Sequence, residues 1–126
     1  MPVRPIAVRR VWRAIGIALI AAVIWLSLTP HPVEIPVEQG DKLGHFAAYG
    51  TLMFWFAQLD ARQRKRLAYA AGFVALGMGL EFVQGLTDYR TFEVADMVAN
   101  AIGVLLGWVG APPRGPDVLG FLERRL

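Results

Sequence analysis

The stretch from Asp41 to Gly50 combines acidic, basic, imidazole and phenol side chains at helical spacing. Asp41, His45 and Tyr49 recur every four residues, and on a helix this spacing places them along one face. Lys42 lies one step round the same helix. An imidazole can exchange a proton with a neighbouring acid, and an ammonium group can pair with a carboxylate or a phosphate. The stretch therefore predicts a polar stripe at the start of a long apolar run.

Two later apolar runs carry matching polar residues. Glu81 and Gln84 lie near the end of one run, and Asp96 and Asn100 lie near the start of the next. An ionisable side chain at depth in a membrane costs about 2.5 to 3.5 kcal/mol on insertion scales and marks a functional candidate. The candidates for acid–base catalysis are His45, Glu81 and Asp96. The candidates for ligand contact are Asp41, Lys42, Tyr49, Gln84, Arg90 and Asn100.

Imidazole and carboxylate groups also suit a divalent metal ion. The spacing matches no metal-binding motif, so we predict no metal site, and the sequence indicates no particular cofactor. The chain has no cysteine, and Ser27 lies on a different apolar run from the polar residues. Nucleophilic catalysis is therefore the weaker alternative.

Composition places the chain in a membrane. Hydrophobic residues make up 56% of the 126 residues, and four apolar runs hold most of them. This is too much apolar surface for the core of a soluble chain of this size. We predict an all-α membrane protein, a four-transmembrane-helix bundle in a single domain over residues 1–126. The predicted spans cover about residues 11–28, 43–59, 67–86 and 94–109.

Both ends of the chain leave a choice of interpretation. The first run has a basic front like that of a signal peptide, but the residues after Ser27 form a poor cleavage site, so we expect an uncleaved span. Residues 111–126 predict a cytoplasmic tail, which is either frayed or forms an interfacial helix. In the second case the residues toward lipid would be Val118, Leu119, Leu122 and Leu126.

The basic residues predict an orientation, since Lys and Arg near span ends are retained in the cytoplasm. Eleven of the thirteen lie in the N-terminal tail and the start of the first span, in the loop at 62–66, or after the fourth span. The predicted topology is N-in and C-in. Anionic lipid headgroups account for the basic charge, so we predict membrane lipids as partners and no nucleic acid.

This orientation places the polar residues in the outer half of the membrane, in two layers at similar depths. At 1.5 Å per residue, one layer lies about 3 Å below the outer boundary and the other at about 8 to 9 Å. The upper layer holds His45, Gln84 and Asp96, and the lower layer holds Tyr49, Glu81 and Asn100. Because a buried carboxyl group needs partners, we expect Glu81 within hydrogen-bonding reach, direct or through one water, of His45, Tyr49, Asp96 or Asn100.

Small and aromatic residues predict how the spans are packed. Asp96, Asn100, Gly103 and Gly107 share a face, which indicates a face turned to protein. Glycines in the third run allow close approach of a neighbouring backbone, at Gly72, Gly77 and Gly79. Four tryptophans near run ends are typical of a membrane-interface belt, at Trp12, Trp25, Trp55 and Trp108.

The order of these motifs resembles the VanZ-like family of small bacterial membrane proteins, from about Leu26 to Trp108. The motifs are Asp41-Lys42-Leu43-Gly44-His45 through Tyr49, then Glu81-Phe82-Val83-Gln84, Arg90, and Asp96 with Asn100 and Gly103. The resemblance implies a multi-pass protein of the inner (cytoplasmic) membrane and of the cell envelope. Founding members are associated with resistance to teicoplanin-type glycopeptide antibiotics. The molecular activity of the family is not settled, so whether the chain is an enzyme stays open.

Three functions fit these observations. In the first, the protein binds the polar head of a lipid-linked envelope component in a cleft that faces outward. Whether it also modifies that head stays open. The second is a structural or partner protein whose polar residues only fix helix packing. The third is an ion or proton path, which lacks aligned ionisable residues in the inner halves of the spans. Bound lipid that copurifies with the chain would favour the first.

Overall fold

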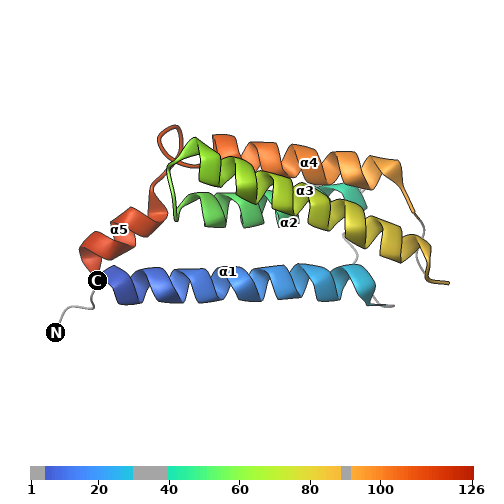
Figure 1. The fold of residues 1–126 in the computed structure, drawn as a ribbon, viewed down its shortest axis with the longest axis horizontal. Helices are drawn as coiled ribbons and strands as arrows, with labels where there is room; N and C mark the ends of the chain where they lie inside the picture. Colours follow the sequence, from blue (N-terminus) through green and yellow to red (C-terminus); the bar gives the residue numbers. More distant parts are fainter. Residues whose placement is uncertain (1–4, 30–39, 89–91) are drawn as a thin grey trace.

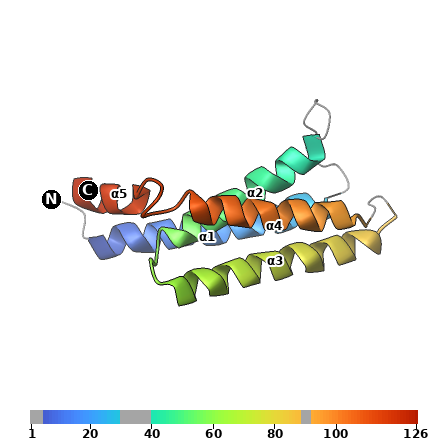
Figure 2. The same cartoon turned by 90° about the horizontal axis from the view of Figure 1, so that it is seen from above.

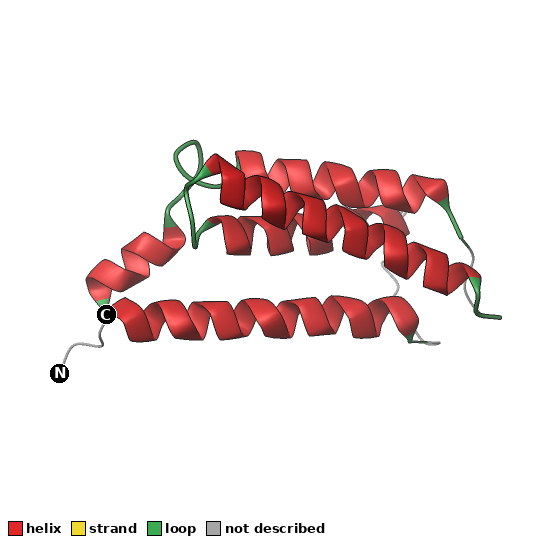
Figure 3. Cartoon of the chain, in the orientation of Figure 1, coloured by secondary structure: helices red, strands yellow, loops and turns green. Residues whose placement is uncertain are grey.

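The computed structural model describes residues 5–29, 40–88 and 92–126, without the side chains of Pro5 and Asp41. This part of the chain is helical and contains no β-strand (Figures 1 and 3). Within it, five helices follow one another: α1 (Pro5–Leu28), α2 (Gly40–Ala57), α3 (Gln63–Gly85), α4 (Val94–Val109) and α5 (Val118–Arg125). The predicted all-α class and the four long runs are thus present as helices.

The four longer helices run alternately up and down, with a short connection between α2 and α3 (Figures 1 and 2). One end of the bundle therefore holds the starts of α2 and α4 and the ends of α1 and α3. The opposite end holds α5 and the start of α1 (Figure 1). The described basic residues of α1, of the 62–66 segment and of the C-terminal tail lie toward that opposite end, away from Lys42.

Two helices are long and apolar enough to cross a membrane, over Ile6–Leu28 and Gln63–Gly85. Val94–Val109 is a shorter apolar helix. In the most apolar windows of the two long helices, only 11% and 22% of the residues are buried. A central helix of a soluble protein would bury most of its apolar side chains, whereas these helices present them outward, as lipid-facing helices do.

The face of α4 that carries Asp96, Asn100, Gly103 and Gly107 is buried, as predicted. Gly103 explains how closely α4 approaches α2, because a Cβ atom there would lie 2.8 Å from the carbonyl oxygen of Phe46. A Cβ at Gly107 would overlap the backbone of α2 more severely. These glycines therefore bring the polar residues of the two helices within contact distance.

On α3 the prediction for the glycines is correct for one residue of three. A Cβ atom at Gly77 would lie 2.7 Å from the Nδ2 atom of Asn100, so α3 approaches α4 closely there. Gly72 and Gly79 have no atom within 4 Å of such a Cβ and lie on the open side of the helix. Helical spacing explains the difference, because neither shares the face of Gly77.

The belt prediction is wrong for Trp12 and Trp55. Their rings are stacked with centroids 3.7 Å apart, and Trp12 is only 5% exposed. Each indole Nε1 donates to the other residue's carbonyl oxygen, at 2.8 and 2.7 Å. The pair joins α1 to α2 in place of facing lipid headgroups. Trp25 is 66% exposed, as a belt residue would be.

The C-terminal tail forms α5, which packs on the bundle. Leu119 is completely buried, so the prediction that it faces lipid is wrong. Gln58 explains the docking: its Nε2 donates to the carbonyl of Pro116 at 3.0 Å and its Oε1 accepts from the Leu119 N–H at 3.2 Å. Phe121 and Leu126 are 49% and 50% exposed, so the tail still presents apolar side chains outward.

Candidate functional site

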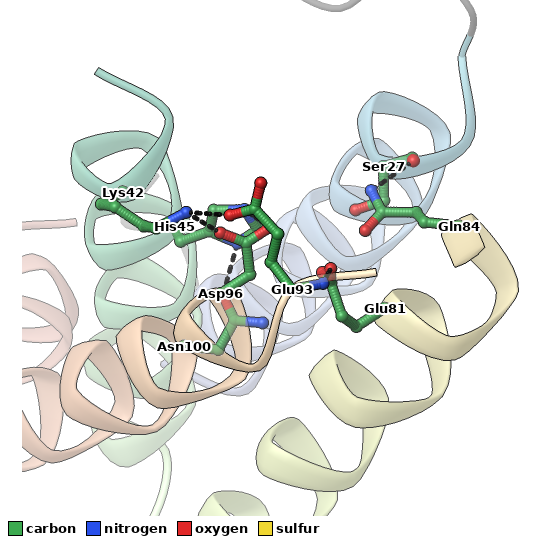
Figure 4. A network of polar contacts seen from close by, with 8 residues as sticks. All are labelled: Ser27, Lys42, His45, Glu81, Gln84, Glu93, Asp96 and Asn100. Carbon is green, nitrogen blue, oxygen red and sulfur yellow. Dashed lines mark hydrogen bonds and ion pairs between the residues drawn. The ribbon is translucent and has the colours of Figure 1, made fainter. Parts of the chain in front are cut away.

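Charged and amide side chains from three helices meet at the end of the bundle where α2 and α4 begin (Figure 4). Helix α2 supplies Lys42 and His45, and α3 supplies Glu81. Helix α4 and the residue before it supply the others. We call this group the charged cluster: Lys42, His45, Glu81, Glu93, Asp96 and Asn100.

Lys42 lies between two carboxylates at the start of α4. Its Nζ donates to Glu93 Oε2 at 2.6 Å and also to Asp96 Oδ1. The Lys42 and Asp96 side chains are only 17% and 11% exposed, whereas that of Glu93 is 45% exposed. The ammonium charge of Lys42 is therefore compensated inside the protein, most closely by Asp96.

His45 contacts α4 through both ring nitrogens. Nδ1 lies 2.6 Å from Asn100 Oδ1, and Nε2 lies 3.5 Å from Asp96 Oδ2. Asp96 and Asn100 are four residues apart, so one helix face presents both. The amide sets the orientation of the ring and leaves Nε2 toward a carboxylate. This is the arrangement in which an imidazole can accept and return a proton.

Glu81 is turned into the bundle and is 1% exposed. Its Oε1 accepts a hydrogen bond from the backbone N–H of Glu93 at 2.6 Å. Its carboxyl group also lies in electrostatic reach of Asp96 and His45. Glu93 precedes the first residue of α4 and has no side-chain cap, so Glu81 satisfies one of the N–H groups that a helix start leaves free. The hydrogen bond of Glu81 is thus to the backbone of Glu93, and the predicted hydrogen-bonding reach to His45, Tyr49, Asp96 or Asn100 stays a prediction.

Tyr49 follows His45 by one turn on α2 and is 2% exposed. Its hydroxyl group is in electrostatic reach of Glu81. Within the described parts of the chain, however, that hydroxyl group has no hydrogen-bond partner. Tyr49 is therefore beside the charged cluster without being tied into it.

Gln84 contacts α1 and is not joined to the charged cluster. Its Nε2 donates to the carbonyl oxygen of Ser27 at 2.7 Å, so the side chain points to α1 and away from His45 (Figure 4). The last carbonyls of a helix lack partners within the helix, and Gln84 supplies one at the end of α1. Two further predicted site residues cannot be placed: Arg90 and the side chain of Asp41 lie outside the described residues.

The opposite end of the bundle holds polar side chains that the sequence does not single out as a group. Arg66 is 3% exposed, and its guanidinium donates to the carbonyl oxygens of Asp60, Pro112 and Ala57. Arg9 donates to the Leu59 carbonyl. We call Arg9, Gln58 and Arg66, with the carbonyls they bind, the carbonyl cluster. It borders a pocket of about 320 Å³ beside α5.

Beside the carbonyl cluster, Asp60 and Arg62 form an exposed ion pair. Arg62 donates to both Asp60 carboxylate oxygens, and these hydrogen bonds lower the pKa of Asp60 to about 2. The pair orders the turn before α3. The sequence shows these residues only as part of a basic loop, because a carbonyl acceptor has no signature in side-chain types.

The arrangement at the charged cluster offers proton exchange at His45 and several hydrogen-bond acceptors. No group of three or more His, Cys, Asp and Glu side chains within the described ranges is placed to hold a metal ion. At this end of the bundle, the residues that could contact a ligand are those of the cluster itself, together with Tyr49.

Comparison with known proteins assigns this chain to a family. A protein from Schizosaccharomyces pombe described as "Uncharacterized protein C11E3.10" is 35% identical over 103 residues, which cover 79% of this chain and 62% of that protein. The chain thus spans less than two thirds of the length of this relative. No solved structure matches. The VanZ/LLP1 family model matches residues 9–114. With its two apolar helices of membrane length, this chain is a membrane protein that belongs to the VanZ/LLP1 family.

Proposed function

We propose that this protein binds the polar head of a lipid-linked envelope component at the charged cluster, on the outer side of the cytoplasmic membrane. The observation that supports it is the convergence of Lys42, His45, Glu81 and Asp96 from three helices at one end of the bundle. Ionisable side chains inside a membrane protein are costly to bury, so they are rarely kept there without a function.

The orientation in this proposal rests on charge asymmetry. The proposed topology has α1 to α4 crossing the membrane with both termini in the cytoplasm. The basic segments lie at the end opposite to the charged cluster, and basic residues favour the cytoplasmic side. The charged cluster would then lie near the outer headgroups, where the head of a lipid can reach it without crossing the membrane.

The effect on the cell would follow from the ligand. If the ligand is an envelope precursor or its acceptor lipid, its capture would change the susceptibility of the cell to teicoplanin-type glycopeptides. The relative comes from a eukaryote, so we describe the ligand by its chemistry and not by a component restricted to bacteria. Modification of the bound head is a second possibility, supported by the orientation of His45 Nε2 toward Asp96 at 3.5 Å.

A structural role is the competing function, and a specific observation favours it. Asn100 contacts Gly77 and His45 at once, so the cluster contributes to the packing of α2, α3 and α4. In that case the cluster would need no ligand. The two functions differ in whether lipid of one class stays with the purified protein.

The test is to purify the full chain in mild detergent and identify retained lipids by mass spectrometry. We expect one lipid class to be enriched about tenfold over the membrane extract, which corresponds to roughly 1.4 kcal/mol of preference. His45→Phe should remove the enrichment while the protein still purifies as a folded species. Thr51→Ala, at an exposed position of α2 outside the cluster, is the control and should keep it. Retained lipid with the composition of the extract would favour the structural role.

A further inference from the structure

We infer that the head recognised at the charged cluster carries a primary ammonium group, and that carboxylates, not Lys42, make the main contact. This inference rests on the proposed function and specifies its ligand. Its basis is the balance of donors and acceptors among the described side chains, together with an unpartnered hydroxyl group at the base of the cluster.

Carboxyl groups outnumber basic groups at the charged cluster. Glu81, Glu93 and Asp96 bring three carboxyl groups, against the single ammonium group of Lys42 and the imidazole of His45. Carboxylates only accept hydrogen bonds. A bound cation would supply the donors and the charge that the described side chains lack.

Lys42 is not placed as a receptor for an anion. Its Nζ is shared between Glu93 and Asp96, and the residue takes part in a further interaction. To bind a phosphate, it would have to leave carboxylates that already compensate its charge. An anionic group would also meet repulsion from Asp96, which lies beside Lys42.

Tyr49 is the second, independent observation. Its hydroxyl group is buried, with the residue 2% exposed, and has no hydrogen-bond partner in the ranges that the structure describes. It lies on the same face of α2 as His45 and in electrostatic reach of Glu81. A buried polar group without a partner is costly and uncommon. A ligand that reaches past His45 toward Glu81 would give this oxygen an N–H donor.

A primary ammonium group fits these acceptors because it has three N–H donors in a compact tetrahedral head. A quaternary ammonium group carries the same charge but cannot donate a hydrogen bond. A glycerol head can donate but brings no positive charge. Lipids that differ only in an ethanolamine, choline or glycerol head therefore distinguish the effect of the head's positive charge on binding from the effect of its hydrogen-bond donors.

The experiment measures binding of short-chain phosphatidylethanolamine, phosphatidylcholine and phosphatidylglycerol to the purified full chain by native mass spectrometry. We expect phosphatidylethanolamine to bind at least about tenfold more tightly than the other two, since charged hydrogen bonds of this kind dominate the contact. Soluble phosphoethanolamine should bind far more weakly. If soluble phosphoethanolamine binds as tightly as phosphatidylethanolamine, the inference of an ammonium group holds, but the inference that the ligand is a lipid is overturned.

Variants locate the contact. Glu81→Gln should weaken phosphatidylethanolamine binding about tenfold, whereas Glu123→Gln, the same change on α5 at the far end, should leave it unaltered. Tyr49→Phe removes only the hydroxyl group and keeps the inference testable if the Glu81 variant does not fold. Tighter binding of phosphatidylglycerol would overturn the ammonium inference and leave the proposed function standing. Equal, variant-insensitive binding of all three lipids would overturn both.

Discussion

The two ends of the bundle differ in how their buried polar groups find hydrogen-bond partners. At one end, side chains of α2 and α4 in the charged cluster pair with one another, as Lys42 does with Asp96, and Glu81 of α3 accepts the backbone N–H of Glu93. At the other end, the carbonyl cluster pairs side-chain donors with backbone oxygens, as Arg66 does with three carbonyls. Both ends lie where helices leave backbone groups unsatisfied.

This difference in partners distinguishes the charged cluster, as a candidate binding site, from the carbonyl cluster, as a structural element. A backbone carbonyl at a helix end needs a donor in every state of the protein, so Arg66 cannot release its partners to bind a ligand. Lys42, His45, Asp96 and Asn100 of the charged cluster are bonded to side chains that can turn, exchange protons or accept a replacement partner, while Glu81 accepts a backbone N–H. The comparison therefore predicts that substitutions at the carbonyl cluster reduce stability, and that isosteric ones at the charged cluster change binding.

The largest loss of stability should come from Arg66→Met. This substitution keeps much of the buried stem but leaves three carbonyls without their donor, and we expect the free energy of unfolding to fall by about 3 kcal/mol. Thermal unfolding in detergent would measure it. The control is Arg64→Met, at an exposed position of α3, which should unfold like the unmodified chain. Equal stability of the Arg66 and Arg64 variants would contradict the scaffold role.

A smaller loss is expected from Gly107→Ala. A Cβ atom there overlaps the backbone of α2 at Gly50 and Phe54, so the helices must separate, at a cost of about 2 kcal/mol. Gly79→Ala is the matched control, because a Cβ there meets no atom within 4 Å. We expect it to be neutral or slightly stabilising. Similar melting of the two variants would show that α2 and α4 can separate without cost.

The helical spacing that includes Gly107 shows which contacts the sequence can predict. Asp96, Asn100, Gly103 and Gly107 follow helical spacing on one element, so their common face is readable from local order alone. The up-and-down order of the helices then brings the starts of α2 and α4 to the same end. This is why the approach of His45 to Asp96 and Asn100 is predictable in outline.

The contacts that the sequence did not predict have partners without a side-chain signature. Arg66 and Gln84 bind backbone carbonyls, and any residue can supply a carbonyl oxygen. The stacking of Trp12 on Trp55 depends on the register between α1 and α2, which a single helix does not encode. The interfacial-helix alternative places Leu119 toward lipid, because apolar residues suit both lipid and a protein core. Only the docking of α5 on Gln58 decides between them.

The tryptophan pair should give a still smaller effect. Trp55→Phe keeps an aromatic ring against Trp12 but removes the hydrogen bond from Trp55 Nε1 to the Trp12 carbonyl. We expect a loss of about 1 kcal/mol, the net value of one such hydrogen bond. Trp25→Phe, at an exposed position, serves as the control in the same melting experiment. A larger loss in the Trp25 variant would mean that α1 is held mainly by other contacts.

The smallest change in stability should accompany the largest change in binding, at Glu81→Gln. The amide oxygen of Gln can still accept the N–H of Glu93, so the start of α4 keeps its partner, and we expect stability to change by less than about 1 kcal/mol. The substitution removes the negative charge, so in the proposed function the envelope phenotype should be lost, measured as teicoplanin susceptibility in cells that carry the variant. Glu123→Gln removes a charge at the other end, where Glu123 pairs with Arg9, and should leave the phenotype intact. A stable Glu81 variant with full activity would show that the charged cluster, like the carbonyl cluster, only holds helices together.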